Sequence, residues 1–314
     1  MEFTIQILGS SSALPTTDRF PSAQVVSYNE HPMLVDCGEG TQIQLRRNHI
    51  SFLKIEHIFI SHLHGDHFYG IFGLLTSMNL LGRKKKLHLY APAELKKVLN
   101  YLWKNTGIDL LYEIQFHAHS GDGLQLIADT KNIQVFSFPL KHSKATWGFR
   151  FSEKQQVPNI RKEMIDRYEL GFSDIRKIKS GQGIYLSDGS FADYTIFTLP
   201  AIAPRTYMYC SDTEYIEDLI NITGPADVLY HEATFASDAQ ELARATGHST
   251  SIQAAHTAMN LGAKALIIGH FSTRYPSVEF LKTEAQAIFS DVFLAYDGAK
   301  FTIDRHSLSL SEIK

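Results

Sequence analysis

Short apolar runs rich in β-branched and aromatic residues recur along the whole chain and predict β-strands. Gly, Pro, Asp or Asn residues bound these runs, which read in order FTIQIL, AQVVSY, PMLVD, EHIFIS, LHLYA, NIQVFSF, TYMYC, DVLYHE, KALIIGH and VFLAY. Between many of them, apolar side chains recur at helical spacing, as Tyr215, Leu219 and Ile220 do. We expect helices over residues 67–81, 93–104, 214–221, 251–261 and 277–289. Strands that alternate with helices predict an α/β domain whose sheets carry helices on their outer faces.

One stretch, residues 153–183, breaks this pattern because it has few apolar residues and no neighbouring strand to pair with. Within it, residues 154–179 carry seven Lys or Arg against four Asp or Glu, a net charge of +3. The stretch is either a solvated surface insertion or a basic arm that binds a polyanion, and charge alone favours the first. A second basic cluster, GRKKK at residues 82–86, is typical of a solvated turn before a strand.

Composition narrows the class of protein further. The 314 residues are 44% hydrophobic, enough for a sizeable core, and the net charge of −3 is no general sign of nucleic-acid binding. The two cysteines, Cys37 and Cys210, form no CxxC pair, which argues against a disulfide framework and a cysteine zinc site. MEFTIQILGS favours a first strand over a secretory signal, and no apolar stretch approaches the roughly 18 residues of a transmembrane helix. We therefore expect a soluble, cytoplasmic protein without a membrane partner.

The segment ISHLHGDHFYG concentrates metal-binding side chains between an apolar strand and a helix-like run. His62 and His64 are two residues apart on an extended backbone, so both can point to the same side. Asp66 and His67 follow the turn at Gly65 and can serve a second point nearby. Imidazole and carboxylate are the ligands that zinc takes when thiolates are absent. The segment predicts a two-metal site, in which ions about 3.5–4 Å apart clamp the attacking and leaving oxygens.

Four side chains cannot fill two zinc coordination shells, so later strand ends must supply the rest. His142 follows the strand-like IQVFSF, Asp212 follows TYMYC, and His270 closes ALIIGH. Each alone is equally well explained as a cap or turn residue, but together they form a coherent set, in which Asp212 could bridge both ions. Glu232 at a strand end and His248 before a helix suggest acid–base chemistry, although a surface charge and a helix-start residue explain them as well.

These residues also carry a family resemblance. SHLHGDH resembles the signature of the metallo-β-lactamase fold superfamily. PLKHS, YCSDT, HEATF, GHSTS, GHFSTRY and AYDG follow in that order and resemble the motif series of ribonuclease Z, the zinc-dependent endonuclease family that trims tRNA precursors at the 3′ end. The resemblance extends from LGSSSALPT near the start to AYDG at residues 295–298. It implies a metallo-β-lactamase-type αββα sandwich, usually a homodimer, that acts on precursor tRNA.

The resemblance also implies roles for the candidate residues. One Zn²⁺ would be held by His62, His64, His142 and Asp212, and the second by Asp66, His67, Asp212 and His270. Asp66 would also orient or deprotonate the attacking water. His248, backed by Glu232, would protonate the departing ribose oxygen.

The charged insert matches the position of the family's protruding arm, which grips the tRNA elbow. We therefore predict a single hydrolase domain over residues 1–314 with an inserted arm at 153–183, where the candidate tRNA contacts are Arg161, Lys162, Arg176, Lys177 and Lys179. The sequence departs from the family here, since ELGFSDIRKIKSG stands where many bacterial members carry a Gly-Pro-rich run.

Two alternatives remain open at this point. The same metals could serve a hydrolase of small phosphodiesters, thioesters or lactams, which would have no use for a basic arm. A non-catalytic RNA-binding relative would be expected to have lost metal ligands, and this sequence retains the whole set.

Overall fold

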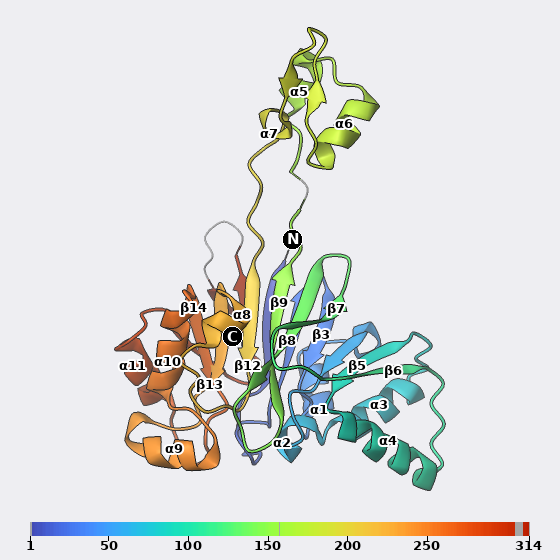
Figure 1. Cartoon of the computed structure of the whole chain (residues 1–314). Coiled ribbons are helices and arrows are strands. Elements are labelled where there is room, and N and C mark those ends of the chain that lie inside the picture. The colour runs from blue at the N-terminus through green and yellow to red at the C-terminus, as the bar shows by residue number, and fades with distance from the viewer. Residues whose placement is uncertain (1, 157, 305–309, 314) are drawn as a thin grey trace. The chain divides into compact units, whose positions relative to one another are not determined.

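The computed structural model describes residues 2–156, 158–304 and 310–313. The chain divides into two compact units, one formed by Met1–Ser152 with Thr206–Lys314 and the other by Glu153–Arg205 (Figure 1). The two chain segments of the first unit therefore fold together around a shared core. Among the described residues, no helix is both long and apolar enough to cross a membrane.

The first unit contains two mixed β-sheets. One has the strand order β17 (Leu310–Ile313), β16 (Lys300–Ile303), β1 (Phe3–Gly9), β2 (Ala23–Tyr28), β3 (His31–Val35), β4 (His57–Phe59), β5 (Leu87–Ala91), β6 (Ile114–Ala118). The other has the order β15 (Val292–Leu294), β14 (Ala265–Gly269), β13 (Val228–Glu232), β12 (Thr206–Cys210), β9 (Thr146–Glu153), β8 (Ile133–Leu140), β7 (Gln125–Asp129). Strands β3 to β6 are parallel to one another, as are β12 to β15. Their carboxyl ends therefore bring side chains from distant parts of the chain to common sheet edges.

The two sheets pack face to face. Their shared core includes Phe59 and Tyr90 from the first sheet and Phe149, Tyr207 and Ile267 from the second. Each such buried side chain contributes roughly 1.5–3 kcal/mol of hydrophobic stabilisation relative to exposure.

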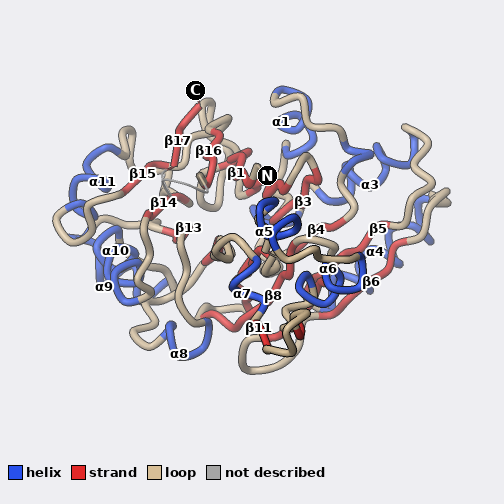
Figure 2. Tube along the Cα trace, turned by 90° about the horizontal axis from the view of Figure 1, so that it is seen from above, coloured by secondary structure: helices blue, strands red, loops and turns tan. Residues whose placement is uncertain are grey.

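Helices cover the outer faces, in the order α1 (Thr41–Arg47), α2 (Gly65–Phe68), α3 (Ile71–Leu80), α4 (Ala93–Thr106), α8 (Leu219–Thr223), α9 (Gln240–Thr246), α10 (Ser251–Asn260), α11 (Glu279–Gln286). Residues of α1, α3 and α4 form a core with the first sheet, and residues of α8, α10 and α11 form another with the second. Figure 2 shows α3 and α4 on one side of the strands and α10 and α11 on the other. The predicted αββα sandwich is confirmed.

Each predicted strand run contains a strand, but two of the predicted helices differ from the structure. The helix expected over residues 67–81 is broken between α2 and α3 at Gly70. The Gly70 N–H donates to the Cys37 carbonyl, and a Cβ at this position would lie 2.1 Å from the Gly38 carbonyl oxygen. The break therefore holds the metal-binding motif against the loop that follows β3.

The helix expected over residues 214–221 was wrong in its first half, since α8 begins only at Leu219. The Thr213 N–H donates to Glu232 Oε1, and the Glu214 N–H donates to the Lys141 carbonyl. These two bonds hold the segment after Asp212 non-helical beside β13 and the end of β8.

The second unit, Glu153–Arg205, has a small core of its own. It contains α5 (Lys162–Arg167), α6 (Phe172–Lys179), β10 (Ile184–Tyr185), β11 (Phe191–Ala192) and α7 (Tyr194–Phe197). Ile178, Ile184 and Phe197 are buried together, and Arg205 Nε donates to Glu153 Oε2 at 2.9 Å where the two ends of the unit meet. The unit begins at the first residue of the predicted insert and continues to Arg205.

Candidate metal centre

In the segment SHLHGDH, between β4 and α3, the backbone changes direction sharply at Gly65, where the extended loop gives way to a short helix. His62 and His64 lie on the extended loop that follows β4, and α2 starts at Gly65, directly after His64. His62 and His67 are fully buried. The chain therefore presents one pair of side chains before the turn and another, Asp66 and His67, within the short helix after it.

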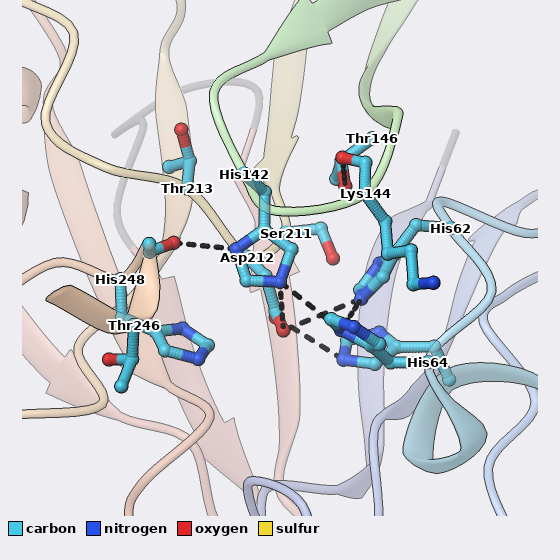
Figure 3. Close-up of polar contacts among 12 residues, drawn as sticks. His62, His64, His142, Lys144, Thr146, Ser211, Asp212, Thr213, Thr246 and His248 are labelled. Atoms are coloured by element: carbon cyan, nitrogen blue, oxygen red, sulfur yellow. Dashed lines mark hydrogen bonds and ion pairs between the residues drawn. The ribbon is translucent and has the colours of Figure 1, made fainter. Parts of the chain in front are cut away.

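The predicted ligands gather into two adjoining groups. Ligand-type atoms of His62, His64, His142 and Asp212 all lie within 4.8 Å of one another, as do those of Asp66, His67 and His270. Figure 3 shows His142 and Asp212 converging on His62 and His64 from neighbouring loops. The structure thus brings together, from both sheets, the seven side chains that sequence reasoning selected as ligands: His62, His64, Asp66, His67, His142, Asp212 and His270.

Asp212 lies between the two groups and faces both. Its Oδ2 lies 3.5 Å from His62 Nε2 and 3.8 Å from His142 Nε2. Its Oδ1 lies 3.2 Å from the Nε2 atoms of both His67 and His270. One carboxylate can therefore serve two cations, one on each oxygen.

The donor set fits metal ions better than hydrogen bonding alone. Asp212 Oδ1 is buried and accepts no hydrogen bond from the residues that the structure describes. Ring nitrogens of neighbouring histidines face each other: His62 Nε2 lies 3.1 Å from His64 Nδ1, and the Nε2 atoms of His67 and His270 are 3.2 Å apart. Tetrahedral ligands at bond lengths of about 2.1 Å would stand about 3.4 Å apart, close to these separations. The residues present thus fit a pair of divalent cations.

The electrostatics of the site favour the metal-binding forms of three histidines and of Asp212. Burial lowers the pKa of His62, His64 and His142, so that they are neutral imidazoles near neutral pH. Burial alone would raise the pKa of Asp212, but the imidazoles of His270, His67 and His62 outweigh it and hold that pKa well below its ordinary value. The site therefore presents lone pairs and a carboxylate to a cation. At His67 burial would lower the pKa, but the carboxylates of Asp212, Asp66 and Asp36 outweigh it and raise the pKa, so a cation would have to displace a proton there.

Further side chains orient the ligands, and sequence reasoning missed them. Asp36 Oδ2 lies 2.8 Å from His67 Nδ1 and accepts a hydrogen bond from the Tyr209 hydroxyl. Thr234 Oγ1 lies 2.9 Å from His270 Nδ1, and the Ala13 N–H donates to Asp66 Oδ2. Such outer contacts hold a ligand ring in one tautomer and one orientation. The sequence marks Asp36 only as an acid that follows a strand. Its place beside His67 depends on the parallel pairing of β3 with β4, in which Val35 lies opposite Phe59.

Glu232 and His248 form the hydrogen-bonded pair that the sequence suggested. His248 Nδ1 lies 2.8 Å from Oε1 of the fully buried Glu232. Burial would lower the pKa of His248, but the Glu232 carboxylate outweighs it and raises that pKa to about 9. Since Nδ1 faces Glu232, Nε2 of His248 is left to act in the cleft, which His64, Asp66 and Asp212 also line. Ligand-type atoms of His248 also lie within 4.8 Å of those of Asp212 and His270, so proximity alone also allows His248 to be a ligand.

The remaining predicted residues lie in the second unit. Lys162, Arg176, Lys177 and Lys179 are exposed, and Arg161 is half-buried and donates from Nη2 to the Ile196 carbonyl. Arg161, Lys162 and Lys179 line a cavity of about 640 Å³ between α5 and α6. The unit thus offers several cationic side chains to solvent.

Solved structures with the same fold support this description of the first unit. The short form of human tRNase Z matches with a TM-score of 0.70 and 24% sequence identity, covering 96% of this chain and 99% of the other. The Bacillus subtilis metallo-β-lactamase fold protein YhfI matches with a TM-score of 0.68 and 18% identity, at the same coverage. The chain therefore has a metallo-β-lactamase-type fold that carries a His/Asp centre suited to divalent cations.

Curated relatives assign the family. Ribonuclease Z of Phocaeicola vulgatus is 40% identical over 303 residues, covering 96% of this chain and 98% of the relative. Ribonuclease Z of Bacteroides thetaiotaomicron is 40% identical over 306 residues, covering 98% of this chain and 97% of the relative. The chain belongs to the ribonuclease Z family, and the predicted resemblance is confirmed. A family model described as Anti-Pycsar protein Apyc1 matches residues 3–135.

Proposed function

We propose that this chain is the endoribonuclease that removes the 3′ trailer from precursor tRNA, leaving a 3′-hydroxyl on the tRNA and a 5′-phosphate on the trailer. The observation that carries the proposal is the complete pair of ligand groups, joined at Asp212 and placed beside Glu232 and His248, in a chain 40% identical to ribonuclease Z. The Apyc1 match favours no other substrate, because it ends at residue 135, before His142, Asp212, His248 and His270.

The proposed cofactor is two Zn²⁺ ions per subunit. His62, His64, His142 and Asp212 would hold one ion, and Asp66, His67, Asp212 and His270 the other. When bound, the ions would polarise the phosphodiester and lower the pKa of a water molecule.

Around that centre, the chain's own residues would handle protons. Asp66 lines the cleft, and the Ala13 N–H fixes its Oδ2 at 2.8 Å, so it is placed to orient the attacking water or to take a proton from it. His248 stays protonated near neutral pH because Glu232 raises its pKa to about 9, so Nε2 can donate to the departing ribose oxygen. The buried Glu232 holds the imidazole in orientation.

The products of a defined substrate test this function. We expect the zinc-loaded protein to cut a precursor tRNA with a labelled 3′ trailer once, at the end of the acceptor stem. Ligation-based end mapping should find a 3′-hydroxyl on the tRNA and a 5′-phosphate on the trailer. A 2′,3′-cyclic phosphate, or scattered cuts along the RNA, would contradict the proposal.

We further propose that the unit Glu153–Arg205 is the tRNA-binding arm of this enzyme. In support, α6 carries Arg176, Lys177 and Lys179 on its exposed surface, and Arg161 and Lys162 lie on the neighbouring segment. Lysine and arginine bind the RNA backbone through its phosphates and displace condensed counterions.

Replacing Arg176, Lys177 and Lys179 together by glutamine should weaken precursor-tRNA binding roughly tenfold near 0.1 M salt. The slope of log K against log salt should also fall in magnitude, by up to about 0.7–0.9 for each lost phosphate contact. Hydrolysis of a small chromogenic phosphodiester should fall far less, since it needs no arm. The matched control replaces Lys84, Lys85 and Lys86, which removes the same charge from an exposed turn of the first unit. Equal losses in both variants would show a general charge effect and reject the arm.

The quaternary structure and cellular location stay proposals that rest on family membership. We propose a homodimer in the cytoplasm, where its substrate is made.

A further inference from the structure

The cleft that contains His64, Asp66, Asp212 and His248 has a volume of about 540 Å³ and a partly apolar rim. On that rim Tyr69 exposes 61% of its surface and Leu14 exposes 62%. The chemistry of the metal ligands and of the Glu232–His248 pair uses neither side chain. Large apolar groups left open beside a reacting phosphodiester are suited to contact the nucleoside next to the cut.

Tyr69 is held as a flat surface by the metal-binding loop. A Cβ at position 65 would lie 2.4 Å from Tyr69 Cε2, so the ring packs directly against the Gly65 backbone. The Phe68 ring supports it at an angle, with centroids 4.9 Å apart. The Tyr69 hydroxyl makes no hydrogen bond to the residues that the structure describes, so the exposed ring is free to bind by stacking.

The position of Tyr69 favours one side of the scissile phosphate. Tyr69 follows directly from the α2 segment that carries Asp66, the residue proposed to act on the attacking water, whereas His248 reaches the cleft from beside the second sheet. His248 would protonate the ribose oxygen of the last tRNA nucleotide. In an in-line displacement the attacking and leaving oxygens lie on opposite sides of phosphorus. The last tRNA nucleotide therefore belongs beside His248 and away from Asp66 and Tyr69. The trailer is bonded to phosphorus through an equatorial oxygen, so it can extend along the cleft rim to Tyr69.

We propose that the ring of Tyr69 stacks on the nucleobase of the first trailer nucleotide and so positions the scissile phosphate over the metal centre. The inference rests on the proposed function. Stacking on an aromatic side chain suits trailers of any sequence, because every base has a π-face.

A double-mutant cycle tests the contact, with Tyr69→Ala and a substrate abasic at the first trailer nucleotide. Each change alone should lower kcat/KM for precursor tRNA by roughly tenfold, mostly through KM, and the two together should lower it no further. Tyr69→Phe, which keeps the ring, should restore cleavage to within about twofold of wild type. Tyr101→Ala, which removes an exposed tyrosine on α4, is the matched control and should cleave like wild type.

Binding gives a readout independent of turnover. With 2-aminopurine at the first trailer position, wild type and Tyr69→Phe should quench the fluorescence on binding, and Tyr69→Ala should not. The inference is overturned, while trailer removal stands, if the losses from the abasic substrate and from Tyr69→Ala multiply. It is also overturned if Tyr69→Ala shows coupling only to a substrate that is abasic at the last tRNA nucleotide. If wild type hydrolyses a small phosphodiester and leaves the trailer in place, the proposed function falls and takes this inference with it.

Discussion

Asp212→Ala should leave the protein folded but unable to hold its metal ions, with kcat/KM for precursor tRNA at least about a thousandfold lower. The expectation follows from position, because Oδ2 of this carboxylate faces His62 and His142 while Oδ1 faces His67 and His270. Removal of a side chain that only orients a ligand typically costs 10- to 100-fold in metal affinity or activity, and loss of a shared ligand should exceed that.

Metal content and thermal stability measure this outcome without relying on activity. We expect about two zinc ions per wild-type chain and well under one per Asp212→Ala chain by mass spectrometry. Added zinc should raise the melting temperature of wild type, since a ligand that binds only the folded state stabilises it, and should leave the variant unchanged. Asp212→Asn keeps the side-chain volume and guards against a packing defect, and Asp18→Ala removes an exposed acid as a control. A variant that retains two zinc ions would refute the bridging assignment.

The side chains that gather at the candidate metal centre could be predicted because most of them follow an apolar strand. His62, Asp212 and His270 stand just after β4, β12 and β14, and the parallel strands around them end at common sheet edges. Strand-end position and residue type, both visible in the sequence, therefore select side chains that the structure brings together. The αββα arrangement follows in the same way from strands that alternate with helices.

What could not be predicted depends on contacts between segments far apart in the chain. Asp36 contacts His67 and Tyr209, and only the sheet order brings these residues together. Residues 214–218 have helical spacing, yet the Thr213 and Glu214 N–H groups bond to Glu232 and Lys141, so tertiary hydrogen bonds overrule the local pattern. The insert was predicted to end at residue 183, whereas the unit continues to Arg205, which pairs with Glu153. The short elements after residue 183 carry too little periodicity to show this end in the sequence.

His248→Ala should separate the leaving-group chemistry from the metal chemistry. Loss of a positioned general acid typically costs 10²- to 10⁴-fold, and we expect a loss in that range for precursor tRNA. The departing ribose oxygen is a poor leaving group that needs the proton. Bis(4-nitrophenyl) phosphate releases a stable phenolate that needs none, so its hydrolysis should fall by less than about tenfold.

Zinc content decides between the two roles that the geometry allows His248. His248 Nδ1 lies 2.8 Å from Glu232 Oε1. If His248 is an acid held in place by that carboxylate, the His248→Ala variant should keep its full zinc content. His31→Ala, which removes an exposed histidine, is the control. If His248 were instead a metal ligand, His248→Ala would lose zinc, and its activity would fall equally on both substrates. That result would overturn the assignment of His248 as the acid. Glu232→Gln should give a smaller, parallel loss on precursor tRNA, because the amide still accepts a hydrogen bond from the imidazole but no longer stabilises its positive charge.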